Sequence, residues 1–249
     1  MLLYIHIGTH KTGTTSIQAF LGRNSSRLAQ SGIFVPKTGT LHEGSGNHNI
    51  AWGLRGDPRF RTPFGTLDDL LVELAGSSAP TGVVSSEDFE YLVDNPNALA
   101  HLDATLINAG HQPHYIVFAR RADTYAVSLY AQLIQHHGLT TSFRNFTWEI
   151  LRTGKVVING DWAFYFDMSA FARKWRAVAH GSISVCGYDS ARAGKGVVPT
   201  FLSLIGAPDD LVCSSEGADV LNTSKAADIP AIDRFVSRWL LRYRFRPTV

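Results

Sequence analysis

The chain has 249 residues, of which 45% are hydrophobic and 11% aromatic, and this is enough for one domain with a sizeable core. Its formal net charge of +2 is too close to neutral to indicate nucleic acid as the main partner. Its two cysteines, Cys186 and Cys213, form neither a CxxC nor a His/Cys metal spacing, which excludes a disulfide scaffold and a structural zinc site.

Short apolar runs alternate with longer helical patterns along the chain. The runs typical of strands buried on both faces lie at 2–7, 82–85, 114–119 and 182–186. The helical patterns lie at about 14–31, 66–76, 97–109, 123–137, 166–179, 197–205 and 228–245. This alternation predicts a single α/β domain over 1–249, with three α/β/α layers and a mainly parallel central sheet.

Two polar stretches interrupt the alternation. Residues 36–64 are rich in Gly, Pro, His and Arg, and the length of this irregular stretch predicts a substrate loop rather than a linker. Residues 187–196 are predicted to form a shorter polar connection. Because no signal-peptide pattern opens the chain and no apolar run approaches the ~20 residues of a membrane span, we expect a cytoplasmic protein.

The stretch GTHKTGTT, residues 8–15, joins the first predicted strand to the first predicted helix. Its glycines permit tight turns, the amides from Gly13 onward face the axis of the new helix, and Lys11 adds a positive charge. These features predict a phosphate-binding loop. In the Walker pattern, however, the lysine follows the second glycine, whereas here it precedes that glycine, so the spacing does not predict a magnesium-nucleotide site.

The segment HKTGTTSIQ, residues 10–18, resembles the 5′-phosphosulfate loop of sulfotransferases that use 3′-phosphoadenosine 5′-phosphosulfate (PAPS). In that family a later strand ends in an arginine, a serine follows eight residues on, and both hold the 3′-phosphate. Here Arg120 and Ser128 have that spacing after the third apolar run, and the spacing favours Arg120 over Arg121. The resemblance implies a P-loop-type fold and PAPS as the cofactor. It assigns the cofactor contacts to Lys11, Thr12, Gly13, Thr14, Thr15, Ser16, Arg120 and Ser128.

Sulfuryl transfer to an alcohol needs neutralisation of charge on the leaving phosphate and a base for the acceptor's proton. Lys11 is expected to neutralise that charge, and no metal is then required. Glu87 is the first choice of base, because it follows the second apolar run at the sheet edge where α/β proteins bind ligands. Some carbohydrate sulfotransferases use a glutamate as base, and this position looks similar. Asp88 and Glu90 are adjacent rivals, and His48 is the histidine alternative.

Several further side chains are candidates for contacts with the acceptor or the cofactor. Trp52, Phe89 and Tyr91 have rings that stack well on a sugar or an aromatic acceptor, although core packing is expected for at least one of them. Ser224 and Lys225 are candidate contacts, and the arginines of the last predicted helix are expected to form a solvated face.

The sequence therefore predicts a sulfotransferase that moves a sulfuryl group from PAPS to a hydroxyl of a carbohydrate or a small metabolite. One alternative is a small-molecule kinase that uses the same loop with a nucleoside triphosphate. Another is a non-catalytic module that binds a nucleotide or a partner. The identity of the acceptor, the choice of base and the oligomeric state stay open at this point.

Overall fold

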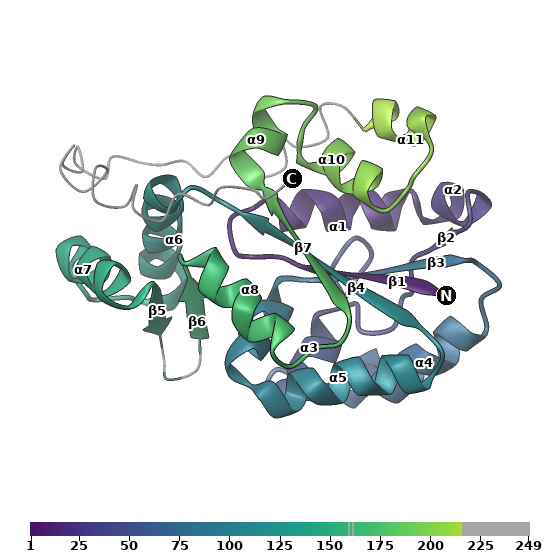
Figure 1. Ribbon diagram of the computed structural model, residues 1–249, viewed down its shortest axis with the longest axis horizontal. Helices are drawn as coiled ribbons and strands as arrows, with labels where there is room; N and C mark the ends of the chain where they lie inside the picture. Colours follow the sequence, from purple (N-terminus) through teal and green to yellow (C-terminus); the bar gives the residue numbers. More distant parts are fainter. Residues whose placement is uncertain (159, 161, 216–249) are drawn as a thin grey trace.

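The computed structural model describes residues 1–158, 160 and 162–215. Its centre is a five-stranded sheet in the order β2-β3-β1-β4-β7, in which every neighbouring pair is parallel (Figure 1). The strands are β1 (Leu2–Ile7), β2 (Ile33–Phe34), β3 (Thr81–Ser86), β4 (Gln112–Ala119) and β7 (Ser182–Gly187). A separate antiparallel pair joins β5 (Lys155–Ile158) to β6 (Trp162–Tyr165).

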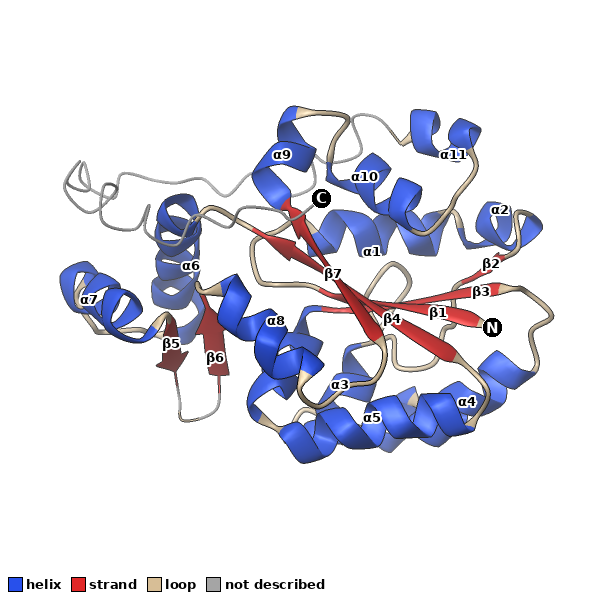
Figure 2. Cartoon of the chain, viewed as in Figure 1, coloured by secondary structure: helices blue, strands red, loops and turns tan. Residues whose placement is uncertain are grey.

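Helices cover both faces of the central sheet (Figure 2). On one side lie α1 (Thr14–Arg23), α2 (Ser25–Gln30), α9 (Tyr188–Ala193), α10 (Val197–Leu204) and α11 (Asp209–Ser214). On the other lie α3 (His48–Arg55), α4 (Leu67–Ala75), α5 (Pro96–Asn108) and α8 (Met168–Arg176). This arrangement confirms the predicted α/β fold of three layers around a mainly parallel sheet, with a glycine-containing loop after its first strand.

Successive side chains of each strand point to opposite faces of the sheet, and this divides the core into two halves. In β1, Leu3, Ile5 and Ile7 pack with α3, α4, α5 and α8, while His6 lies on the opposite face. In β4, Phe118 faces α10 in the second half. Burial on both faces explains why these strands appear in the sequence as continuous apolar runs.

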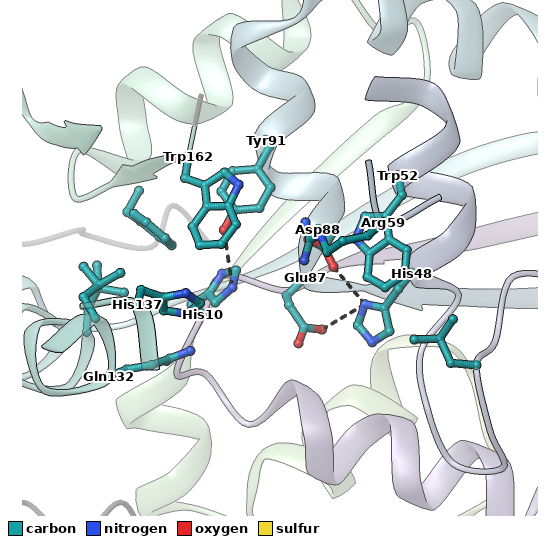
Figure 3. A pocket seen from close by; sticks show the side chains of 14 residues that line it. His10, His48, Trp52, Arg59, Glu87, Asp88, Tyr91, Gln132, His137 and Trp162 are labelled. Atoms are coloured by element: carbon teal, nitrogen blue, oxygen red, sulfur yellow. Dashed lines mark hydrogen bonds and ion pairs between the residues drawn. The ribbon is translucent and has the colours of Figure 1, made fainter. Parts of the chain in front are cut away.

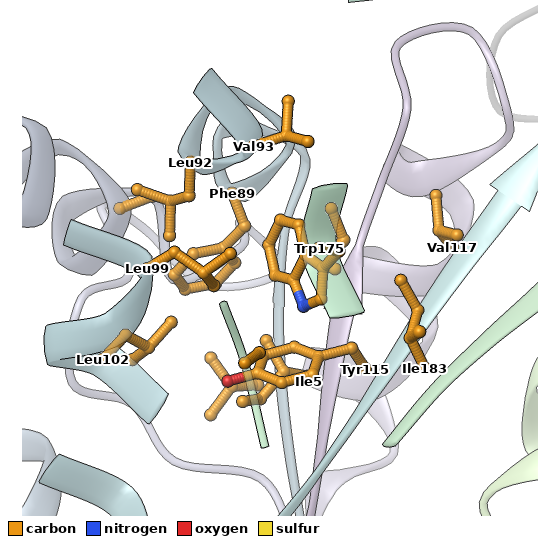
Figure 4. Close-up of a cluster of buried hydrophobic side chains, with 14 of the residues drawn as sticks. Ile5, Phe89, Leu92, Val93, Leu99, Leu102, Tyr115, Val117, Trp175 and Ile183 are labelled. Carbon is orange, nitrogen blue, oxygen red and sulfur yellow. The ribbon is translucent and has the colours of Figure 1, made fainter. Parts of the chain in front are cut away.

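A large aromatic cluster fixes α8 against the sheet (Figure 4). The ring of Trp175 stacks on Phe171 at 5.6 Å and meets Tyr115 edge-on at 5.1 Å. The Tyr115 hydroxyl donates to the carboxylate of Asp103 at 2.8 Å, and that carboxylate also accepts the N–H of His180 at 2.7 Å. The buried carboxylate thereby holds the turn that leads into β7.

A third apolar cluster lies beside the main sheet. It combines α6 (Ala122–His137), α7 (Phe143–Thr153) and the β5–β6 pair with Tyr91 of the 3-10 segment η2 (Glu87–Asp94). Tyr130 packs on Phe143 and Phe146 at 4.9 Å and 5.2 Å between ring centres. This unit extends the sheet edge where the functional residues gather.

Three details of the sequence prediction need correction. The stretch 36–64 is not irregular throughout, because it contains α3 and the 3-10 turn η1 (Thr62–Phe64). The connection 187–196 contains α9, and the helix expected at 14–31 breaks at Asn24, whose amide side chain donates to the Phe20 carbonyl at 3.0 Å. The helix predicted at 228–245, with Ser224, Lys225 and the arginine row, lies outside the described residues. Within the described part of the chain, every helix is too short or too polar to cross a membrane.

Candidate active site

Three neighbouring strands bring the predicted site residues to one edge of the sheet. Ile7 at the end of β1 is in register with Ser86 at the end of β3, and β4 lies on the other side of β1. The phosphate-type loop, Glu87 and Arg120 follow these three strand ends directly. Side chains that are far apart in the sequence therefore meet where open parallel sheets bind their ligands.

The loop after β1 has the backbone of an anion site. Lys11 adopts a left-handed conformation with φ of 64°, which is uncommon for a residue other than glycine and concentrates at functional sites. Gly13, with φ of 81°, is the N-cap of α1, and no side chain caps the helix. The first amides of α1 are therefore left for a ligand, where the helix dipole favours negative charge.

The loop hydroxyls divide into two groups. Thr12 is fully buried, and its hydroxyl donates to the carbonyl of Thr9 at 2.6 Å, so it holds the loop together. The Thr14 hydroxyl is buried and has no hydrogen-bond partner among the described residues. Ser16 is also buried, whereas Thr15 is exposed. An unpaired buried hydroxyl at the first residue of α1 is a donor in need of an acceptor.

Arg120 packs directly on this loop. Its guanidinium donates to the carbonyl of Lys11 at 3.1 Å and lies 5.3 Å from the centre of the Tyr188 ring. The neighbouring Arg121 turns outward and pairs with Asp123 at 2.6 Å. Burial and the nearby Arg120 lower the pKa of Lys11.

Ser128 lies two turns into α6, the helix that follows Arg120. Its hydroxyl is buried and has no partner among the described residues, although a helical serine can donate to the carbonyl four residues earlier. Leaving such a group unpaired costs free energy. Ser128, Arg120 and Thr14 together supply polar groups whose hydrogen-bonding capacity is not used up by the protein.

A cavity of about 310 Å³ opens beside the loop (Figure 3). His10 of the loop, His48 and Trp52 of α3, and Glu87 lie in its walls, and Trp162 comes from β6. Figure 3 shows the Glu87 carboxylate directed into the open space between His10 and His48. The structure thus brings two base candidates, Glu87 and His48, to one cavity, which is also lined by His10 of the loop that contains Lys11.

A side chain of helix α1 holds the Glu87 carboxylate in place. The amide nitrogen of Gln18 donates to Oε2 of Glu87 at 2.9 Å, and Nδ1 of His48 lies 3.9 Å from the same oxygen. Gln18 is buried, whereas the Glu87 side chain is 23% exposed. The helix that begins at the phosphate-type loop therefore also fixes the orientation of this carboxylate.

His48 is held by a carboxylate and a hydroxyl. Its Nδ1 lies 3.0 Å from Asp88 and 2.9 Å from the Ser86 hydroxyl. Burial alone lowers the pKa of His48, but the hydrogen bond with Asp88 and the charges of Glu87 and Asp88 raise it above its ordinary value. Burial likewise opposes ionisation of Asp88, yet His48 and Arg59 lower its pKa to about 2. His48 and Asp88 therefore favour an ion pair.

A second pair of a histidine and a carboxylate lies on the opposite wall of the cavity. Nδ1 of His10 contacts the buried carboxylate of Glu90, and Nε2 lies 3.4 Å from the Tyr91 hydroxyl. Burial lowers the pKa of His10, but the charge of Glu90 and its hydrogen bond outweigh this and raise it. Glu90, which the sequence left as a rival base, is 2% exposed and faces His10 rather than the open cavity.

Of the three ring candidates, Trp52 and Tyr91 line the cavity, while Phe89 is buried in the main core. Sequence reasoning missed Gln18, Arg59 and Trp162. Nothing in their local patterns marks them, because each gains its role from a contact with a distant segment. Among the described residues, no group of three or more His, Cys, Asp or Glu side chains is arranged to hold a metal ion.

Three chains of known structure match this one, including the following two. The crystal structure of a sulfotransferase from Alicyclobacillus acidocaldarius has a TM-score of 0.49 and 16% identity, over 84% of this chain and 83% of that one. The mouse sulfotransferase SULT7A1 complexed with PAP has a TM-score of 0.43 and 15% identity, over 99% of this chain and 79% of that one. No family model and no curated protein sequence matches the chain. Its function must therefore be inferred from its own residues.

Proposed function

We propose that this protein is a sulfotransferase that moves a sulfuryl group from PAPS to a hydroxyl of a carbohydrate or another small metabolite. The proposal depends on one observation: Arg120, Ser128 and the loop after β1 have polar groups that are available to bind a ligand. Arg120 contacts the loop backbone, and Ser128 and Thr14 offer buried hydroxyls to which no described residue is hydrogen-bonded. Such a group suits a ligand with two separate anionic ends, as PAPS has.

The residues present fit this cofactor. The amides at the start of α1, with Lys11 and Thr14, would hold the phosphosulfate end, and Thr15 and Ser16 continue the same turn of helix. Arg120 and Ser128 would hold the 3′-phosphate, for which the guanidinium provides a fixed fork of donors. Thr12 and Gly13 shape the loop. When bound, the cofactor would supply an activated sulfuryl group and, as the leaving group, the phosphate to which that group is attached.

Glu87 is proposed as the base. The acceptor oxygen forms a bond to sulfur while the bond from sulfur to the phosphate oxygen breaks, and the hydroxyl proton passes to Glu87. Lys11 and the helix amides neutralise the charge that grows on the leaving phosphate. The products are the sulfate ester and 3′-phosphoadenosine 5′-phosphate (PAP).

His48 is the less suitable base of the two cavity residues. Its Nδ1 is engaged by Asp88, and its raised pKa favours the protonated form, which has no proton-accepting nitrogen. A protonated His48 instead stabilises the Glu87 carboxylate 3.9 Å away. This arrangement supports Glu87 as the proton acceptor and His48 as its neighbour in the cavity wall.

The kinase alternative meets an obstacle at Thr12. In magnesium-dependent P-loop enzymes the hydroxyl that follows the lysine binds the metal. Here that hydroxyl belongs to Thr12, which is fully buried and donates to the Thr9 carbonyl. The loop as folded therefore offers no hydroxyl to magnesium at that position.

The test is ligand-induced thermal stabilisation, because a ligand that binds only the folded state raises Tm. PAP should raise Tm more than ADP or ATP with magnesium, and Arg120→Ala should abolish the shift. Arg121→Ala is the matched control, since this neighbouring arginine faces outward, and it should keep the shift. Stabilisation by magnesium ATP alone would favour the kinase. Tight PAP binding without transfer to any acceptor would favour the non-catalytic module.

A further inference from the structure

Stacked rings and guanidinium groups form one wall of the cavity. Arg59 lies 4.6 Å above the Trp52 ring and 5.5 Å from the Trp162 ring. Trp162 in turn stacks on Tyr91 at 6.3 Å, with the two planes within 23° of each other. The Trp52 ring is buried, and His48 also stacks on it at 5.9 Å, so the flat groups available to a ligand are the Arg59 guanidinium and the half-buried Trp162 ring. They suit a ligand with a ring that carries C–H groups on one side.

The positive groups of this cavity are already paired. Arg59 donates to both carboxylate oxygens of Asp57, at 2.9 Å and 2.7 Å, and to Asp88 at 3.0 Å. His48 is paired with Asp88, and His10 contacts Glu90. A further negative group entering the cavity would therefore compete with a carboxylate at each of these cations.

The remaining histidine in the wall adds no charge. His137 of α6 packs edge-on against Trp162 at 4.9 Å between ring centres. Burial, with the nearby positive charges of His10, His136 and Arg59, lowers its pKa, so it is neutral near pH 7. Beside it, Gln132 offers an uncharged amide to the same cavity. This side of the cavity is suited to hydroxyl groups.

Of the two carboxylates of described residues that line the cavity, Glu87 has the longer ion pair, because His48 lies 3.9 Å from it, whereas Asp88 lies 3.0 Å from both His48 and Arg59. The closest hydrogen bond of Glu87 comes from the neutral amide of Gln18, and the nearest histidine nitrogen is 3.9 Å away. An anionic acceptor would approach this carboxylate and the negatively charged cofactor at the same time. Like charges at such short range disfavour binding.

We propose that the part of the acceptor that enters this cavity is a sugar ring without an acidic group, with its C–H face on Arg59 and Trp162 and its hydroxyls toward Glu87, Gln132 and His137. The inference rests on the proposed function and narrows its acceptor class. A volume of about 310 Å³ accommodates a small ring of this kind. Acidic sugars, such as uronates or rings that already bear sulfate, are excluded by charge.

The experiment compares matched acceptors with sulfur-radiolabelled PAPS and the full chain. The panel holds methyl glucoside, methyl galactoside and N-acetylglucosamine as neutral sugars and glucuronate and galacturonate as acids. We expect kcat/KM for the best neutral sugar to exceed that of every acid at least about tenfold. Equal or better transfer to an acid overturns the inference, as does transfer to no neutral sugar.

Two further measurements distinguish a failure of the proposed function from a failure of the sugar assignment alone. Stabilisation by PAP is measured first. If PAP does not stabilise the protein, the proposed function is refuted. If PAP stabilises it but the preferred acceptor is not a neutral sugar, only the sugar assignment is refuted. Asp57→Asn removes the carboxylate that pairs with Arg59 and should shift the ratio of acidic to neutral acceptor activity toward acids by about tenfold. Glu149→Gln is the control, because it unpairs the exposed Arg152 on α7 and should leave the ratio unchanged. An unchanged ratio in folded Asp57→Asn protein contradicts the charge argument.

Discussion

Replacing Ser128 with alanine should affect stability and cofactor binding in opposite directions. The Ser128 hydroxyl is buried and has no partner in the part of the chain that the structure describes, so its removal relieves the cost of an unsatisfied polar group. Alanine is also the better helix former, by a few tenths of a kcal/mol. We therefore expect the free energy of unfolding of the unliganded protein to stay the same or rise by about 1 kcal/mol.

Binding of PAP should weaken in the same variant. A hydrogen bond to a charged phosphate contributes about 1.5–3 kcal/mol, which corresponds to a loss of affinity of about tenfold to a hundredfold. Urea unfolding without ligand measures the first effect, and titration calorimetry with PAP measures the second. The direction of the change in unfolding free energy and the direction of the change in PAP affinity together distinguish a ligand-binding hydroxyl from one with a structural role.

Thr147 of α7 provides the matched control. It is also a buried helical hydroxyl, but it donates to the carbonyls of Phe143 and Arg144 at 2.9 Å and 3.0 Å. Thr147→Ala should lower the free energy of unfolding by at least about 1 kcal/mol and leave PAP affinity unchanged. If Ser128→Ala instead destabilised the free protein and bound PAP normally, the assignment of Ser128 to the 3′-phosphate would be refuted.

Three further predictions concern the proposed base Glu87, the Gln18 amide that donates to it, and the buried His6. Glu87→Gln should lower kcat by about a hundredfold to ten-thousandfold with unchanged PAP affinity, and near-normal turnover would remove Glu87 as the base. Gln18→Met should lower kcat by about tenfold, again with normal PAP binding, because the Glu87 carboxylate loses its 2.9 Å donor; an unchanged kcat would show that the contact is dispensable. His6 is fully buried, and burial lowers its pKa to about 3, so the unfolded chain takes up a proton first and stability falls as the pH drops below about 6.5. Between about pH 7.5 and pH 5 the wild type should lose about 2 kcal/mol more than His6→Gln in urea unfolding, and parallel losses in the two proteins would contradict this account.

The sequence predicted four of the five strands of the central sheet, all but β2, and the positions of the proposed cofactor residues at the sheet edge, for a physical reason. Strands buried on both faces appear as continuous apolar runs, and the loop residues follow directly after β1. Arg120 and Ser128 are likewise close in sequence, at the end of β4 and within α6. Local patterns carry enough information for such features.

The acceptor cavity could not be predicted in the same way. Its contacts join distant segments, as between Gln18 and Glu87, which are 69 positions apart, or between Arg59 and Trp162. Helix α3 escaped prediction because Gly53 lies inside it and other glycines flank it, which gives the stretch the composition of a loop. The short strand β6, which ends just before the helix predicted at 166–179, was not predicted.

The two halves of the site come from different kinds of segment. Under the proposed function, the loops at the strand ends of the central sheet and Ser128 of α6 hold the cofactor, whereas α3, the C-terminal half of α6 and β6 supply most of the acceptor wall. Trp52 and Trp162 can thus be exchanged without altering any strand of the main sheet. Under that assignment, new acceptor preferences can be selected at these two positions while the residues assigned to the sulfuryl donor stay unchanged.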